Sequence, residues 1–160
     1  MKHWDKEIAK EINPQITIKI TKEDVVDILS SALCGGIDYW GELVPNDWQY
    51  EETRDWLREN AEPEYDDGEI CYEEVVAQIL FDGKSVTVRD SEDDKESWLS
   101  LSNLAQGIQT AFREGYYSDY NWLVPDGGGS NKWHLEPDQI DAEVADVIIQ
   151  LSVLGDVVYG

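Results

Sequence analysis

Basic residues are scarce in this sequence. It has 12 lysines and arginines against 35 aspartates and glutamates among 160 residues, which gives a formal net charge of −23 at pH 7. Binding to nucleic acids or to anionic membranes depends on clusters of basic side chains, so we expect neither here. Solubility needs far less charge than this, and self-repulsion destabilises a compact fold. The excess of acids therefore predicts a basic partner.

Cysteine and histidine are equally rare, with two of each. Cys34 and Cys71 stand apart in apolar surroundings, so we expect no disulfide framework and a reducing cytoplasm as the location. His3 and His134 are too scattered to complete a zinc site with them, and no cofactor is expected. No apolar run approaches the length of a membrane span, and residues 1–5 do not begin a signal peptide.

A set of catalytic residues is also missing. Cys34 ends an apolar helix face, which favours a core position over a nucleophile, and His134 has no nearby partner in the sequence. Among 35 acids some pair always lies at the distance that glycosidases use, so that pattern is uninformative. The glycines at 127–129 lack the preceding strand and the following lysine of a phosphate-binding loop. The sequence predicts a binding protein and not an enzyme.

The apolar spacing predicts a single α+β domain with a small, mostly antiparallel sheet and about five helices. This domain covers residues 14–160, and residues 1–13 form an N-terminal arm. Period-two alternation predicts strands at 15–21, 85–89 and 97–101. Three-and-four spacing predicts helices after the N-cap Thr21, over 50–60, over 72–81, after Ser102 or Asn103, and over 139–154.

The last helix is expected to organise the core. Its buried stripe comprises Ile140, Val144, Val147, Ile148, Leu151 and Leu154. Its polar side comprises Gln139, Glu143, Asp146 and Gln150. Asp138 is expected to cap this helix and Gly155 to end it. Trp56 and Trp98 fit the periodicity of core residues as well.

The segment 38–74 concentrates the charge. It holds 14 acidic residues against Arg54 and Arg58, a net charge of −12, and we expect a partly irregular acidic insert. Carboxylates three or four residues apart on a helix lie about 5–6 Å apart, which makes mimicry of DNA phosphates feasible. The alternative is a generally solvated acidic face. The predicted partner-binding acids are Asp47, Glu51, Glu52, Asp55, Glu59, Glu62, Glu64, Asp66, Asp67, Glu69, Glu73 and Glu74.

Two acidic loops, 66–69 and 90–94, are candidates for calcium or magnesium sites. Neither has the full spacing of an EF-hand, so we expect solvated loops and no metal site. Aromatic residues in loops are a further candidate for binding, because Trp and Tyr dominate interface hot spots. The predicted aromatic anchors are Trp48, Tyr117, Tyr120 and Trp122. Packing in the core is the alternative for each of them.

Three stretches resemble a known family: Leu-Cys-Gly-Gly-Ile-Asp-Tyr-Trp at 33–40, Glu-Gly-Tyr-Tyr-Ser-Asp-Tyr-Asn-Trp at 114–122, and Gln-Ile-Asp-Ala-Glu-Val-Ala-Asp-Val-Ile-Ile-Gln at 139–150. The sequence is similar there to small acidic, mostly uncharacterised proteins of prophages and mobile elements in gut Firmicutes. The resemblance runs from about Ile16 onward and is most specific in 139–150, whereas 48–74 resembles an insertion. It implies a counter-defence protein in a bacterial host, with anti-CRISPR proteins as the nearest class, and it supplies no catalytic residues.

The sequence and the resemblance together predict a non-enzymatic inhibitor of a bacterial nucleic-acid-targeting defence system. The leading hypothesis is an anti-CRISPR protein that blocks an RNA-guided nuclease by acidic DNA mimicry. Its partner would be a basic nucleic-acid-binding protein, with no direct binding of nucleic acid and none of membranes. The alternatives are an acidic adaptor or structural protein of a mobile element, an anti-restriction protein, and a protein that depends on a divalent cation.

Overall fold

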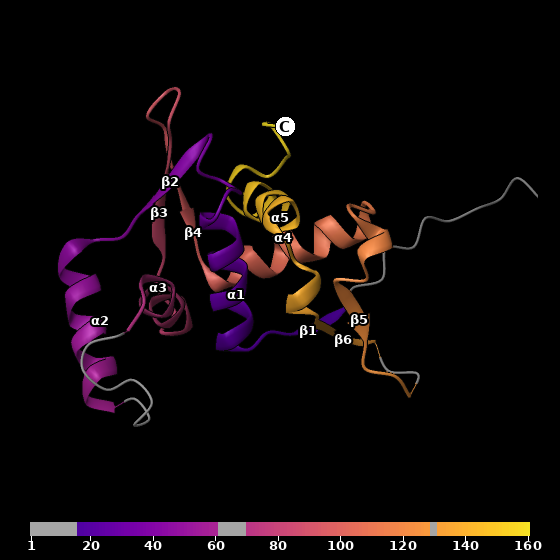
Figure 1. Ribbon diagram of the computed structural model, residues 1–160, viewed down its shortest axis with the longest axis horizontal. Helices are drawn as coiled ribbons and strands as arrows, with labels where there is room; N and C mark the ends of the chain where they lie inside the picture. The colour runs from indigo at the N-terminus through magenta and orange to yellow at the C-terminus, as the bar shows by residue number, and fades with distance from the viewer. Residues whose placement is uncertain (1–15, 61–69, 129–130) are drawn as a thin grey trace, which may run out of the picture.

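The computed structural model describes residues 16–60, 70–128 and 131–160 (Figure 1). Within these ranges the chain forms five α-helices and two three-stranded sheets in which antiparallel pairing predominates. The prediction of a single α+β domain with about five helices is confirmed. The predicted N-terminal arm, residues 1–13, lies outside the described residues.

The elements alternate along the chain, with the sheets split between distant segments. The α-helices are α1 (Lys22–Leu33), α2 (Asp47–Asn60), α3 (Tyr72–Phe81), α4 (Leu101–Arg113) and α5 (Ala142–Leu154). The strands are β1 (Thr17–Lys19), β2 (Gly41–Val44), β3 (Val86–Asp90), β4 (Glu96–Leu99), β5 (Leu123–Pro125) and β6 (Lys132–Leu135). Two short 3₁₀ helices are η2 (Ser118–Tyr120) and η3 (Pro137–Gln139).

One sheet has the order β2-β3-β4 and is antiparallel throughout. Its β3–β4 hairpin confirms the pair of strands predicted within 85–101. The other sheet has the order β1-β6-β5, and its β1 runs parallel to β6 with Thr17 opposite Lys132. Strands β2, β5 and β6 were not predicted. Each has only three or four residues, and β2 lies in the segment expected to be partly irregular. Strand β1 falls within the strand predicted at 15–21.

Side-chain caps fix where the helices begin. Thr21 caps α1 as predicted: its Oγ1 accepts a hydrogen bond from the Asp24 amide at 3.0 Å, and the Asp24 carboxylate accepts one from the Thr21 amide at 2.9 Å. Helix α4 is capped by Ser100, with Asn103 completing the capping box, so the prediction of Ser102 or Asn103 as the cap is wrong.

The start of α5 also differs from the prediction. Asp141 caps it by accepting from the Val144 amide at 2.9 Å, whereas Asp138 belongs to η3. The reason is Pro137, which opens a separate 3₁₀ turn before the α-helix begins. Gly155 ends the helix with φ of 76°, as predicted, because a left-handed residue is needed there.

Helix α5 lies at the centre of the core, packed against α4 and α1 (Figure 1). Val144, Val147, Ile148 and Leu151 are buried as the spacing predicts. Helices α4 and α5 approach so closely at Gly107 that a methyl group there would lie 2.1 Å from Ser152 Oγ and 2.7 Å from the Ile148 carbonyl oxygen. Glycine at this position therefore permits the central helix contact.

Four burial predictions are wrong. Gln150, expected on the polar side of α5, is fully buried because residues 157–159 fold back over it. Trp56 and Trp98, expected in the core, are 51% and 59% exposed. Trp56 lies on the side of α2 away from its packed residues, and Trp98 lies on the outward side of β4. Cys34 is exposed because it follows the last buried turn of α1.

Candidate partner-binding surfaces

Helix α2 forms the outermost layer at one end of the molecule and packs on α3 (Figure 1). Thr53 and Leu57 are its buried residues, and the ring of Tyr50 lies 5.6 Å from that of Tyr72 on α3. These inward residues recur at three-and-four spacing, with Gln49 and Arg54 partly buried beside them, and the other positions face solvent. The amphipathic helix predicted over 50–60 is confirmed and begins three residues earlier.

The exposed side of α2 carries the predicted acids of this helix together with two tryptophans. We call it the α2 outer face, and it consists of Asp47, Trp48, Glu51, Glu52, Asp55, Trp56 and Glu59. Trp48 is 73% exposed, the most of any large apolar side chain in the described ranges. The prediction that Trp48 is available to a partner is thus consistent with its position.

Two arginines only partly offset this charge. Asp55 lies 3.8 Å from Arg58 Nη1 and 4.0 Å from Arg54 Nε, both at the outer limit of an ion pair. The ion pairs found among the described residues include none to Asp47, Glu51, Glu52 or Glu59. Exposed pairs of this kind contribute about 0–1 kcal/mol, so the face keeps a negative potential.

The other predicted acids are placed differently. Glu73 and Glu74 are half-buried in the first turn of α3, where carboxylates stabilise the positive end of the helix dipole. Glu62, Glu64, Asp66, Asp67 and Glu69 lie outside the described residues. Exposed acids also occur on other elements, for example Glu23 on α1 and Glu92 in the turn after β3. Negative charge is therefore not confined to the segment 38–74.

Of the other predicted aromatic anchors, one is buried and two reach the surface. Trp122 is only 2% exposed, so its assignment as a surface anchor is wrong. Its ring packs edge-on against Phe112 of α4, and its Nε1 donates to the Tyr116 carbonyl oxygen at 2.9 Å. Tyr117 and Tyr120 pack on each other with ring centroids 5.3 Å apart, and Tyr120 is 39% exposed. Both lie in the turn that follows α4 and are at least partly exposed to solvent.

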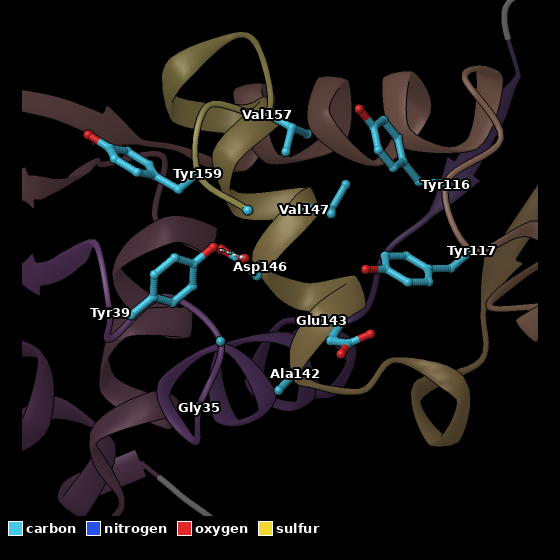
Figure 2. A pocket seen from close by; sticks show the side chains of 12 residues that line it. Gly35, Tyr39, Tyr116, Tyr117, Ala142, Glu143, Asp146, Val147, Val157 and Tyr159 are labelled. Carbon is cyan, nitrogen blue, oxygen red and sulfur yellow. Dashed lines mark hydrogen bonds between the residues drawn. The ribbon is translucent and has the colours of Figure 1, made fainter.

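Tyr117 also borders a cleft that the sequence did not predict. This tyrosine cleft has a volume of about 390 Å³ and is lined by Tyr39, Tyr116 and Tyr117, by Glu143 and Asp146 of α5, and by the chain around Val157 (Figure 2). The three stretches that carry the family resemblance, 33–40, 114–122 and 139–150, meet here. Each contributes residues that are far from the others in the sequence, so spacing could not have linked them.

A hydrogen-bonded carboxylate forms the base of the tyrosine cleft. Asp146 accepts from the Tyr39 hydroxyl at 2.7 Å, from Trp40 Nε1 at 2.7 Å and from Gln150 Nε2 at 3.0 Å. Burial, together with the hydrogen bond to Asp146 and its charge, raises the pKa of Tyr39 to about 12. Burial and the charges of Glu143 and Asp141 raise the pKa of Tyr117 as well. Both phenols therefore remain protonated donors at neutral pH.

His134 has partners that the sequence did not reveal. Its Nδ1 lies 2.5 Å from Asp126 Oδ1, and its Nε2 lies 3.1 Å from Glu136 Oε1. The β5–β6 pairing brings Asp126 alongside His134, so the expectation that this histidine has no partner is wrong. Hydrogen bonds to Asp126 and then to Glu136 raise the pKa of His134. The three side chains form a cluster at the β5–β6 edge in which the two carboxylates favour the charged form of the imidazole.

In the part of the chain that the structure describes, no group of three or more His, Cys, Asp or Glu side chains could hold a metal ion. In the 90–94 loop, Asp90 instead accepts hydrogen bonds from the Tyr159 hydroxyl and the Glu92 amide. The loop at 66–69 lies outside the described residues. None of the helices in the described ranges is long and apolar enough to span a bilayer.

The protein is therefore an acidic α+β domain with two notable surface features: an acidic helix that exposes tryptophan side chains, and a cleft lined by tyrosines. Comparison with protein-family models, with curated proteins and with solved structures found no match.

Proposed function

We propose that the protein is a non-enzymatic inhibitor of a nucleic-acid-targeting defence enzyme in a bacterial cytoplasm. In this proposal it is an anti-CRISPR protein that occupies the basic nucleic-acid channel of an RNA-guided nuclease. The observation that supports it best is the α2 outer face, where four carboxylates without an ion-pair partner in the described structure lie on the same exposed helix as Trp48. Such a face complements a groove lined by lysine and arginine.

The charge density of DNA indicates how many acidic residues of the protein must take part in mimicry. Helix α2 has 14 residues. At a rise of 1.5 Å per residue it spans about 21 Å, and a DNA duplex of that length carries about 12 negative charges. Helix α2 has five carboxylates and two arginines, so its net charge of −3 falls short of this number, whereas the net charge of the whole segment 38–74 is −12. We therefore assign the contact to α2 together with the acids that follow it in the sequence, with the exposed Trp48 as the anchor that the partner would bury.

The test is a cleavage assay against a panel of RNA-guided nucleases with purified protein. The triple substitution of Glu51, Glu52 and Glu59 to Lys is expected to abolish inhibition, because it turns the α2 outer face basic. The matched control replaces Glu23, Glu92 and Asp138 with Lys, which changes the net charge equally on other exposed elements. Retention of inhibition by the α2 variant, with circular dichroism showing both variants folded, would contradict the proposal.

Ionic strength provides a second readout in the same assay. Raising NaCl from about 50 mM to about 300 mM shortens the Debye length and should weaken inhibition strongly if charge drives it. Inhibition that is unaffected by salt would point to an allosteric mechanism and away from mimicry.

A second candidate function is favoured by the carboxylates on α1 and in the β3–β4 turn, which extend the negative field beyond α2. A generally acidic surface suits an adaptor of a mobile element or an anti-restriction protein. A restriction enzyme in the assay panel and a pull-down from host lysate separate these functions from inhibition of an RNA-guided nuclease.

A further inference from the structure

The tyrosine cleft combines aromatic walls with negative charge. Figure 2 shows the hydroxyl groups of Tyr39 and Tyr117 pointing toward one another across α5, with Glu143 and Asp146 on the helix between them. No lysine or arginine is among the described residues that line it. None of the residues of the α2 outer face lines this cleft, so it is a separate acidic site.

The charge of this cleft selects the sign of its ligand. An anion would be repelled by Glu143 and Asp146, and a purely apolar group would remove these carboxylates from water without replacing their hydrogen bonds. A cation that carries hydrogen-bond donors is attracted by both carboxylates and replaces the hydrogen bonds that they lose with water. It is attracted to the faces of the tyrosine rings as well, since cation–π attraction acts within about 6 Å of a ring centroid. A volume of about 390 Å³ lies near the lower end of the roughly 300–1,000 Å³ typical of ligand sites, which suits a single side chain.

The carboxylates are prepared for a cation in two ways. Asp146 is oriented by Tyr39, Trp40 and Gln150, all neutral donors, so its charge is held in place without being neutralised. Oδ1 accepts two of these hydrogen bonds and Oδ2 only one, which leaves one of the roughly four acceptor positions of the carboxylate open at Oδ2. Glu143 is exposed beside Tyr117 and takes part in none of the ion pairs found among the described residues.

Among biological cations, the planar guanidinium matches this arrangement best. It stacks on aromatic rings, and it carries five donors in one plane that bind carboxylates in pairs. A lysine ammonium is more strongly hydrated and loses more on entering a cleft with tyrosine walls. We propose that the tyrosine cleft receives the guanidinium group of an arginine side chain that a basic partner protein presents. This inference deepens the proposed function by naming a second contact with that partner, and it rests on the proposed function for the partner's identity only.

The test uses the whole protein, labelled with ¹⁵N, and acetyl-arginine-methylamide as the probe. Titration followed by NMR is expected to give saturable shifts of the Gly36, Tyr39, Tyr117 and Glu143 amides, while amides of α2 move little. The same titration with acetyl-lysine-methylamide should show binding at least threefold weaker. Shifts of equal size on α2 and around the cleft, or equal binding of the lysine probe, would overturn the assignment.

Two variants assign the binding to the cleft. Glu143→Gln removes an exposed charge, and Tyr117→Ala removes one wall; each should weaken arginine binding about fivefold to tenfold. The matched controls are Glu114→Gln on the neighbouring turn and Trp98→Ala, an exposed aromatic residue of β4 outside the cleft, which should bind as the unaltered protein does. Binding that survives both cleft substitutions would overturn the inference.

The nuclease assay separates the two proposals. If the protein binds the arginine probe in the cleft and inhibits no nuclease, the proposed function fails and the cleft assignment stands. If inhibition is intact in Glu143→Gln and Tyr117→Ala, which have lost arginine binding, the cleft is not the partner contact and this inference fails while the proposed function stands.

Discussion

The side-chain amide of Gln150 forms hydrogen bonds with both the backbone N–H and the backbone carbonyl group of Tyr159. Its Oε1 accepts from the Tyr159 amide at 2.9 Å, and its Nε2 donates to the Tyr159 carbonyl oxygen at 2.9 Å. Oε1 also accepts from the Val158 amide at 2.8 Å. The ring of Tyr159 then stacks on Trp40 with centroids 5.4 Å apart, and its hydroxyl donates to Asp90. One buried amide thus fastens the segment after α5 to the core and to β3.

Replacing Gln150 with Leu should destabilise the protein, because the amides of Val158 and Tyr159 would lose their acceptor in a partly buried place. Each net hydrogen bond contributes about 1 kcal/mol, so we expect the free energy of unfolding to fall by about 2–3 kcal/mol. Urea unfolding measures this change, and hydrogen exchange should show lost protection at residues 158 and 159. Gln139→Leu, at an exposed position, is the control. Equal stability of the two variants would contradict the assigned role.

Replacing Gly107 with Ala should force α4 and α5 apart. The added methyl group would overlap Ser152 Oγ and the Ile148 carbonyl oxygen, and overpacking in a core costs about 1–3 kcal/mol. Thermal unfolding should show a lower Tm for this variant. Gln106→Ala on the exposed side of the same helix is the control and should change the free energy of unfolding by less than about 0.5 kcal/mol. An unchanged Tm in Gly107→Ala would show that the helices can separate at little cost.

Asp90 should contribute to acid unfolding. Hydrogen bonds from Tyr159 and from the Glu92 amide lower the pKa of Asp90 below its ordinary value of 3.8. A carboxyl with a depressed pKa stabilises the fold fully above its unfolded-state pKa and loses that contribution as pH falls through the folded-state pKa. Urea midpoints between pH 7 and pH 3 should therefore fall less steeply in Tyr159→Phe, which removes the main hydrogen bond without changing charge. Identical slopes would argue against the contact.

His134 should give the opposite dependence on pH. Asp126 and Glu136 raise its pKa above the ordinary value of 6.5. Its contribution to stability is therefore complete below that value and is lost as pH rises through the folded-state pKa. The stability difference between the unaltered protein and His134→Gln should shrink between pH 6 and pH 9. NMR titration of the imidazole should show a lower pKa in Asp126→Asn, and an unchanged pKa there would refute the pairing.

The long elements could be predicted because their signals are local. Thr21 and Asp24 form a capping box within four residues, and Gly155 marks the end of α5. Strand β1 was predicted within 15–21, because Ile16, Ile18 and Ile20 alternate with polar residues there. Its partner β6 was not predicted, and the parallel pairing of Thr17 with Lys132 depends on the tertiary fold.

The spacing of apolar residues predicted the two sides of each helix, but it could not predict which other segments pack on them. Gln150 does lie on the polar side of α5, but the segment at 157–159 covers that side and buries it. Trp56 adjoins the buried Leu57, and only the position of α3 determines which of the two faces inward. For the candidate sites, the exposure of Trp48 and Glu51 followed from their positions on one helix. The tyrosine cleft required residues from three distant stretches.

The parallel pairing of β1 with β6 affects the order in which the chain can fold during its synthesis. Thr17 and Lys132 are paired although 115 positions separate them. At about 5–20 residues per second, translation delivers the second strand roughly 6–23 s after the first. The β3–β4 hairpin and helices α1 to α4 can form from neighbouring residues in that interval, whereas β1 must wait for its partner. The pairing of β1 with β6, like the packing of α1 on α5, therefore joins the two halves of the chain only after the intervening elements have been made, and closing so long a loop makes it a slow step.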